Sequence, residues 1–97
     1  MQTQHALAAL AALAQESRLA IFRLLVQAGP DGMAASKIAA HLAIAPSSLS
    51  FHLKELSHAQ LVTARQEGRF IIYAAHMDSM NALIGFLTEN CCGGAPC

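Results

Sequence analysis

Two short helical segments, joined by a break of only a few residues, constrain the fold more than any other feature of this sequence. Residues 35–42 and 46–59 both repeat apolar side chains at the spacing of one helix face. Pro46 ends the break, and proline is favoured at the first position of a helix. The inward-facing residues are expected to be Ile38, Ala39, Leu42, Leu49, Leu53 and Leu56. This spacing predicts a helix-turn-helix, in which the first helix braces the second.

After residue 61 the apolar pattern changes from a helical period to one that is typical of strands. Residues 62–67 and 70–74 flank Gly68, which predicts a β-hairpin with this glycine at its tip. The hairpin carries Arg65 and Arg69, whose side chains could reach the nucleic-acid backbone or minor groove beside the second helix. A hairpin that follows a helix-turn-helix in this order and spacing predicts a winged helix-turn-helix.

Further helices are expected on both sides of this centre. Alanine and leucine, both strong helix formers, dominate the start of the chain. A second helix runs over about residues 17–28 and ends at the Gly-Pro-Asp-Gly sequence of residues 29–32. Apolar residues on two adjacent faces, with Leu19 and Val26 among them, predict that this second helix is buried over most of its circumference.

The last helix is expected to begin at Met77, with Asp78 or Ser79 as its N-cap. No internal repeat or linker divides residues 1–97, so we expect one domain with helices at both ends that serve dimerisation. The predicted order is α-α-α-α-β-β-α, a mainly α fold with one small β-hairpin.

The apolar content of the chain exceeds what one small domain needs for its own core. Hydrophobic residues make up 55% of the sequence and charged residues only 12%. A domain of this size buries only about 60–65% of its unfolded surface, so we expect a second copy to cover the excess. The leucines of the first helix either cover the core or form half of a dimer interface, and Phe86 is expected outside the stripe of the last helix. The expected interface residues are Leu7, Leu10, Leu13, Met80, Leu83, Ile84 and Leu87.

The charged residues balance over the whole chain but not locally. Six Lys and Arg against six Asp and Glu give a formal net charge of zero, which alone disfavours a nucleic-acid partner. Between residues 47 and 70, three cations against two carboxylates leave a net charge of +1 when the histidines are not counted. We therefore expect the salt dependence of DNA binding by a dimer to be modest, equivalent to about 4–6 phosphates.

Four segments, taken together, follow one pattern over residues 17–73. They are SRLAIFRLL at 17–25, IAAHLAIAPSSLSFHLKEL at 38–56, AQLV at 59–62 and RQEGRFIIY at 65–73. In this combination the chain resembles the ArsR/SmtB-type metalloregulatory transcriptional repressors. The resemblance implies a homodimer that binds an inverted-repeat operator in double-stranded DNA and releases it when an inducer binds.

By this resemblance, the DNA-binding positions lie on the second helix of the motif and on the hairpin. Phe51 stands where many family members carry arginine, so it either contacts a thymine methyl group or packs toward the wing. His52 either contacts a base or has a partly buried structural role. The DNA-binding residues that the resemblance implies are Ser47, Ser48, Ser50, Phe51, His52, Lys54, Arg65 and Arg69.

All three cysteines lie within the last seven residues, 91–97, which we take as a sensor tail. Four residues, Gly-Gly-Ala-Pro, separate Cys91 and Cys92 from Cys97, and the two glycines let the chain fold back and bring three sulfurs to one ion. Three thiolates suit a thiophilic ion, and As(III) or Sb(III) favours three-coordinate geometry. Zinc usually takes a fourth ligand, for which only Glu89 or Asn90 could serve weakly here. The tail also resembles that of arsenite-responsive members of the family.

Alternatives to an arsenic or antimony sensor are a redox switch, a sensor of Cd, Pb or Cu(I), a tail that carries or buffers metal, and a tail without function. The other metal sites of the family lack their ligands here, since the third helix has no Cys-x-Cys entry and the last helix has no histidine pair at i, i+3. A winged helix that binds a protein instead of DNA is a further alternative. An enzyme is not expected, because no histidine lies near the cysteines to act as a base.

The sequence also bears on where the protein is expected to act. Its longest unbroken apolar run spans nine residues, 6–14, whereas a membrane-spanning helix needs about 20. No lysine or arginine precedes this run, as one would in a secretory signal. We therefore expect a cytoplasmic protein, whose cysteines are kept reduced.

Overall fold

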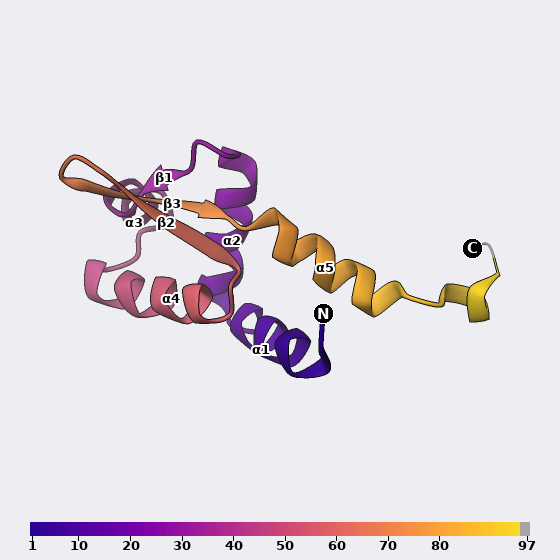
Figure 1. Ribbon diagram of the computed structural model, residues 1–97. Helices are drawn as coiled ribbons and strands as arrows, with labels where there is room; N and C mark the ends of the chain where they lie inside the picture. Colours follow the sequence, from indigo (N-terminus) through magenta and orange to yellow (C-terminus); the bar gives the residue numbers. More distant parts are fainter. Residues whose placement is uncertain (96–97) are drawn as a thin grey trace.

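The computed structural model describes residues 1–95 and has the predicted mainly α fold with a small hairpin (Figure 1). Its elements, in chain order, are α1 (Thr3–Leu13), α2 (Glu16–Ala28), β1 (Met33–Ala34), α3 (Ala35–Leu42), α4 (Pro46–His58), β2 (Val62–Glu67), β3 (Phe70–Ala75), α5 (Met77–Thr88) and the 3-10 turn η1 (Cys91–Gly94). The predicted order of elements is confirmed, and the structure adds two elements that were not predicted, β1 and η1. Both are too short to show a periodic pattern.

The sheet is antiparallel throughout and has the strand order β1-β3-β2. Glu67 pairs with Phe70, so Gly68 and Arg69 form the two-residue tip of the hairpin. Gly68 has a φ of 61°, which suits the tight turns that join antiparallel strands. β1 adds a short third strand through the pairing of Met33 with Tyr73, and thereby joins the start of α3 to the hairpin.

The hydrophobic core lies where α2, α3 and α4 meet the sheet. Leu49, Leu53 and Leu56 of α4 are at most 2% exposed, which confirms the expected inner face of this helix. Ile38 of α3 is fully buried, as are Ile21 and Leu25 among the α2 residues. Because one face of α4 is sealed in this way, its opposite face is left to solvent.

α1 packs on the core mainly through its alanines, and of its three leucines only Leu13 packs against the core. Ala6, Ala9 and Ala12 are buried, whereas Leu7 and Leu10 are 60% and 40% exposed. Alanine brings the helix backbone close to its neighbours, and close packing gains dispersion energy. The alternative in which these leucines cover the core is therefore wrong for Leu7 and Leu10, while their role in a dimer interface stays a prediction.

Two expected burial patterns are wrong. In α2, Leu19 and Val26 are exposed, because the neighbouring elements cover only the face that carries Ile21, Phe22 and Leu25. In α5, Phe86 was expected outside the apolar stripe, but it packs against the core. Of the predicted interface residues, Leu83 is buried in its own chain, and Leu13 and Met80 pack partly against the core.

The start of α5 is tied to the end of α4. α5 begins at Met77 as predicted, but its N-cap is His76 and not Asp78 or Ser79, which lie inside the first turn. The backbone N–H of His76 donates to the Leu61 carbonyl at 2.8 Å, and its ring Nδ1 lies 3.0 Å from the Gln60 carbonyl. These bonds explain the displaced cap, because they hold His76 beside the loop that leaves α4.

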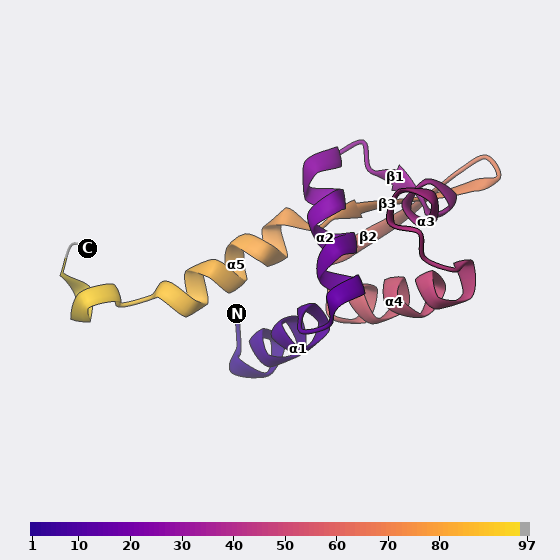
Figure 2. The same cartoon turned by 180° about the vertical axis from the view of Figure 1, so that it is seen from behind.

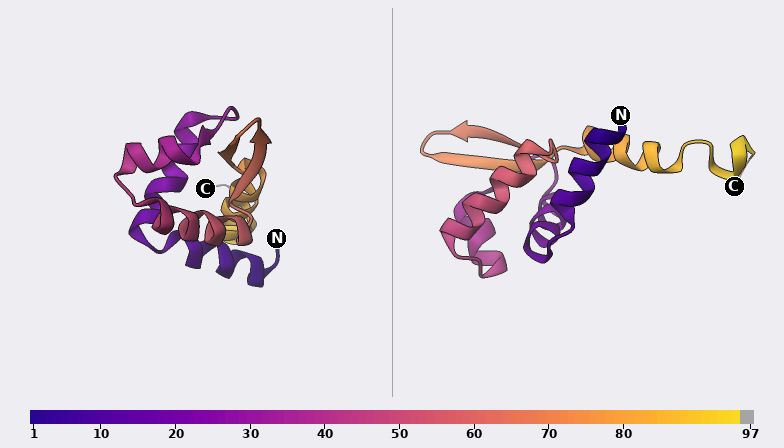
Figure 3. Two further views of the ribbon diagram at one scale, coloured as in Figure 1. Left: turned by 90° about the vertical axis from the view of Figure 1, so that its left-hand side faces the viewer. Right: turned by 90° about the horizontal axis from the view of Figure 1, so that it is seen from below.

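The arrangement of the elements separates two ends of the molecule. The N-terminal end of α4 and the tip of the hairpin reach toward one end, and α5 extends toward the other (Figures 1 and 2). α1 runs beside α4, as the view from below shows (Figure 3). Within residues 1–95, no helix is both long enough and apolar enough to cross a membrane.

Candidate nucleic-acid interface

The outer face of α4 carries most of the residues expected to face DNA. Ser47, Ser48, Ser50, Phe51 and Lys54 are all exposed, because the leucines of the same helix point into the core. Pro46 occupies the first turn, and no side chain caps the N-terminal amides. These amides and the serine hydroxyls together offer hydrogen-bond donors of the kind that contact phosphate oxygens.

Phe51 is the most conspicuous apolar residue on this face. Its side chain is 56% exposed, so packing toward the wing, one of its two expected roles, is not seen. Its ring meets that of His52 edge to face, with the centroids 5.7 Å apart. An exposed aromatic ring in this position could contact a thymine methyl group in a major groove.

His52 lies at the inner border of the same face and is half-buried. Its Nδ1 is 3.5 Å from Nη1 of Arg18, which comes from the first turn of α2. Arg18 was not among the residues that the sequence singled out. The structure thus places His52 in contact both with Phe51 on the exposed face of α4 and with Arg18 of α2.

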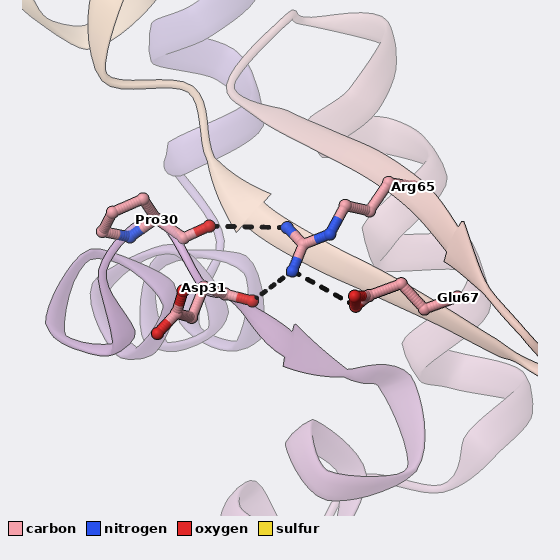
Figure 4. A network of polar contacts seen from close by, with 4 residues as sticks. All are labelled: Pro30, Asp31, Arg65 and Glu67. Atoms are coloured by element: carbon pink, nitrogen blue, oxygen red, sulfur yellow. Dashed lines mark hydrogen bonds and ion pairs between the residues drawn. The ribbon is translucent and has the colours of Figure 1, made fainter.

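Arg65 is held within the chain and does not point freely from the wing (Figure 4). Its Nη2 donates to the Asp31 carbonyl at 2.8 Å and lies 3.3 Å from the Glu67 carboxylate, and its Nη1 donates to the Pro30 carbonyl at 3.4 Å. These contacts fasten the hairpin to the loop between α2 and β1. Arg69, by contrast, is exposed at the hairpin tip, and no hydrogen bond or ion pair is seen for it within the described residues.

The predicted sensor tail is described only in part. The Sγ atoms of Cys91 and Cys92 lie 3.8 Å apart, and the chain reverses through positive φ angles at Cys92 and Gly93. Cys91 is disulfide-bonded in this structure, and Cys97 lies outside the described residues. Residues 1–95 contain no group of three His, Cys, Asp or Glu side chains placed to hold a metal ion.

Residues 13–65, more than half of the chain, match the family model described as "Helix-turn-helix domain". The chain belongs to this helix-turn-helix family. The matched segment runs from the end of α1 into the hairpin, so it includes α4 and the residues packed behind it. The exposed face of α4 is therefore the outer face of a helix-turn-helix.

This helix-turn-helix chain is also similar to individual proteins, in sequence and in structure. It is 31% identical over 80 residues to the nodulation protein NolR of Rhizobium meliloti. The aligned segment covers 82% of this chain but only 63% of NolR. An ArsR-like transcriptional regulator from Rhodococcus sp. RHA1 superposes with a TM-score of 0.79 at 28% identity, covering 89% of this chain and 78% of that one. The homodimeric winged helix-turn-helix DNA-binding domain of Mb0332 from Mycobacterium bovis gives 0.72 at 26% identity, covering 95% and 85%.

These likenesses confirm the winged helix-turn-helix fold and the resemblance to ArsR-type regulators. The two solved structures are described as a transcriptional regulator and as a DNA-binding domain, which agrees with the expectation that the chain is not an enzyme. The finer resemblance, to members that respond to arsenite, stays a prediction.

Proposed function

We propose that the chain is a DNA-binding transcriptional repressor that recognises an inverted-repeat operator in double-stranded DNA as a homodimer. The observation that carries the proposal is the exposed outer face of α4 at the same end of the molecule as the hairpin tip. α4 would enter the major groove, and the hairpin would contact the adjacent backbone or minor groove. The similarity to an ArsR-like transcriptional regulator supports this role.

Exposed apolar side chains on α1 and α5 support the homodimer. Ile84 and Leu87 of α5 are 52% and 57% exposed, and Leu7 and Leu10 of α1 are exposed as well. Such residues on helices at both ends of a small chain suit burial against a second copy. The Mb0332 domain, which covers nearly the same length, is homodimeric.

The inducer in this proposal is As(III) or Sb(III), bound to the thiolates of Cys91, Cys92 and Cys97. The adjacency of Cys91 and Cys92 and the reversal of the chain at Cys92 and Gly93 support it, once the disulfide of Cys91 is reduced. The tail directly follows α5, whose apolar face belongs to the proposed dimer interface, so binding there would change the spacing of the two α4 helices. By linkage, DNA must weaken metalloid binding by the same factor.

The test measures operator release by the reduced protein. Fluorescence anisotropy of a labelled duplex from the chain's own promoter region is followed while arsenite, antimonite, cadmium and zinc are added in parallel. A phosphine is used as reductant, because dithiols bind arsenite themselves. We expect release by arsenite or antimonite, and we expect Cys91→Ser, Cys92→Ser and Cys97→Ser each to require at least about tenfold more inducer, as loss of one of three ligands implies.

Thr88→Ser, an exposed change at the end of α5, is the matched control and should release DNA like the unchanged protein. If all three cysteine variants still release DNA normally, the sensor assignment is wrong. If the unchanged protein shifts no DNA at all, the winged helix serves as a protein-interaction module instead.

A redox-responsive repressor is the second candidate, because Cys91 is disulfide-bonded in this structure. In that case oxidation alone would change operator affinity, and reduction would restore it without any metal. Anisotropy titrations of oxidised and reduced protein, both free of metalloid, separate this function from metalloid sensing.

The two wing arginines are expected to differ in how they affect DNA binding. Arg69→Ala should weaken operator binding and reduce the magnitude of the salt slope by about two, since each of the two protomers would lose one phosphate contact at its hairpin tip. Arg65→Ala should leave the slope unchanged, because the Pro30 and Asp31 carbonyls already occupy its guanidinium. Operator affinities measured at several salt concentrations give the salt slopes of both variants. A reduced slope for Arg65→Ala alone would contradict the assignment of the phosphate contact to Arg69.

A further inference from the structure

Arg18 connects three helices through its own hydrogen bonds. Its backbone N–H donates to the Gln15 side-chain oxygen at 2.8 Å, which caps α2. Its Nε donates to the Ala12 carbonyl in the last turn of α1 at 2.7 Å. Its Nη1 faces Nδ1 of His52 in α4 at 3.5 Å. One side chain in α2 thus joins the helix of the proposed dimer interface to the helix of the proposed DNA interface.

The contact with the Arg18 guanidinium determines which ring nitrogen of neutral His52 carries the proton. A guanidinium has only donors, so Nδ1 of His52 can take part in this contact only as an acceptor. The proton of the neutral ring is then on Nε2, and the ring carries a hydrogen-bond donor there.

We propose that Arg18 is a positioning residue for DNA recognition, which holds α4 against α1 and keeps His52 in its Nε2–H form. This inference rests on the proposed function and adds a specificity to it. A donor on His52 pairs with acceptors, namely phosphate oxygens, guanine O6 or N7, adenine N7 and thymine O4. It does not pair with the amino groups of cytosine or adenine.

The shape of the arginine side chain is needed for this role. Nε and Nη1 are held in one plane at a fixed spacing, so the Ala12 carbonyl and His52 are engaged together. A groove of about 320 Å³ between α1 and α4 lies beside the guanidinium and is also lined by Glu55 and His58. Lysine in place of Arg18 would keep the charge but has only one nitrogen, and could not span both partners in this geometry.

The tautomer can be measured on the unchanged protein. Long-range ¹H–¹⁵N NMR spectra of the imidazole rings, recorded above pH 8 where histidines are neutral, show which nitrogen carries the proton. We expect His52 to be the Nε2–H tautomer. An Nδ1–H tautomer would overturn the proposal, whatever the behaviour of any variant.

The positioning role is tested with Arg18→Lys and with Arg23→Lys as its matched control. Arg23 lies on the exposed face of the same helix, and no hydrogen bond or ion pair is seen for it within residues 1–95. We expect Arg18→Lys to weaken operator binding about tenfold, as loss of a hydrogen bond to a charged group implies, with an unchanged salt slope. Arg23→Lys should bind within about twofold of the unchanged protein, as surface changes usually do.

Two results would overturn the positioning role. One is an affinity of Arg18→Lys within twofold of the unchanged protein. The other is the same tenfold loss in a His52→Ala background, since a residue that acts through His52 should matter much less once that ring is gone. If the unchanged protein binds no operator, the proposed function fails by itself, and the NMR measurement still reports on the contact between Arg18 and His52.

Discussion

Ile84→Asp is expected to convert the proposed homodimer into monomers at micromolar concentration and to weaken operator binding more than about 100-fold. Ile84 lies on the outward face of α5 and is 52% exposed in the single chain. In a homodimer the new carboxylate would occur twice and would lose its hydration without gaining a cationic partner. A penalty of about 3 kcal/mol already corresponds to a factor above 100 in affinity. Operator binding follows, because a monomer contacts only one half-site.

Sedimentation equilibrium gives the oligomeric state, and anisotropy at matched salt gives the operator affinity. Ile71→Asp is the matched control for the oligomeric state, since Ile71 is 48% exposed on the hairpin, away from α1 and α5. It should remain a dimer. An Ile84→Asp protein that remains dimeric would place the interface elsewhere.

The helix-turn-helix and the hairpin could be predicted because local chemistry specifies them. Pro46 sets the start of α4, three leucines at helical spacing set its buried face, and Gly68 sets the tip of the hairpin. Each signal acts over a few residues, so no knowledge of the rest of the fold was needed. β1 was missed because its two residues depend on their pairing with β3 and show no period of their own.

The buried faces of the outer helices could not be predicted in the same way. In α1, leucines and alanines both recur every three residues, so spacing alone does not show which row faces the core. A hydrophobicity scale favours the leucines, whereas close packing favoured Ala6 and Ala9. In α5, Phe86 lies three residues after the buried Leu83 and shares its face, whereas Ile84 and Leu87 are exposed, and spacing alone does not show which of these apolar faces meets the core.

The candidate site was predictable on α4 and less so around it. The carbonyls that hold Arg65 are more than 30 residues away in sequence, so its engagement could not be foreseen. Arg18 did carry a signal. A cation in the first turn of a helix is unfavourable beside the positive end of the helix dipole, so Arg18 is expected to have a partner outside α2. That partner is the Ala12 carbonyl in the last turn of α1.

Gly32→Ala is expected to destabilise the fold by about 3 kcal/mol, the second large effect. Gly32 has a φ of 70°, a conformation that L side chains rarely adopt. A Cβ there would also clash with the Tyr73 carbonyl oxygen and lie 3.0 Å from Cγ2 of Ile72. Because Tyr73 pairs with Met33, the backbone must move where β1 joins β3. The same shift would disturb the neighbouring Asp31 carbonyl, which holds Arg65 and hence the hairpin.

Gly68→Ala separates the cost of the positive φ from the cost of the Cβ clash. Gly68 has a similar φ of 61° but no atom within 4 Å of the added Cβ. It should lose only about 1 kcal/mol, the conformational part alone. For a domain of this size, thermal unfolding should therefore show Tm falling by roughly 12–24 °C for Gly32→Ala and roughly 4–8 °C for Gly68→Ala. Both must be measured at one protein concentration, since the proposed dimerisation would make Tm depend on it. Equal losses at the two glycines would mean that the approach of Gly32 to β3 does not stabilise the wing, and that its positive φ alone explains the glycine.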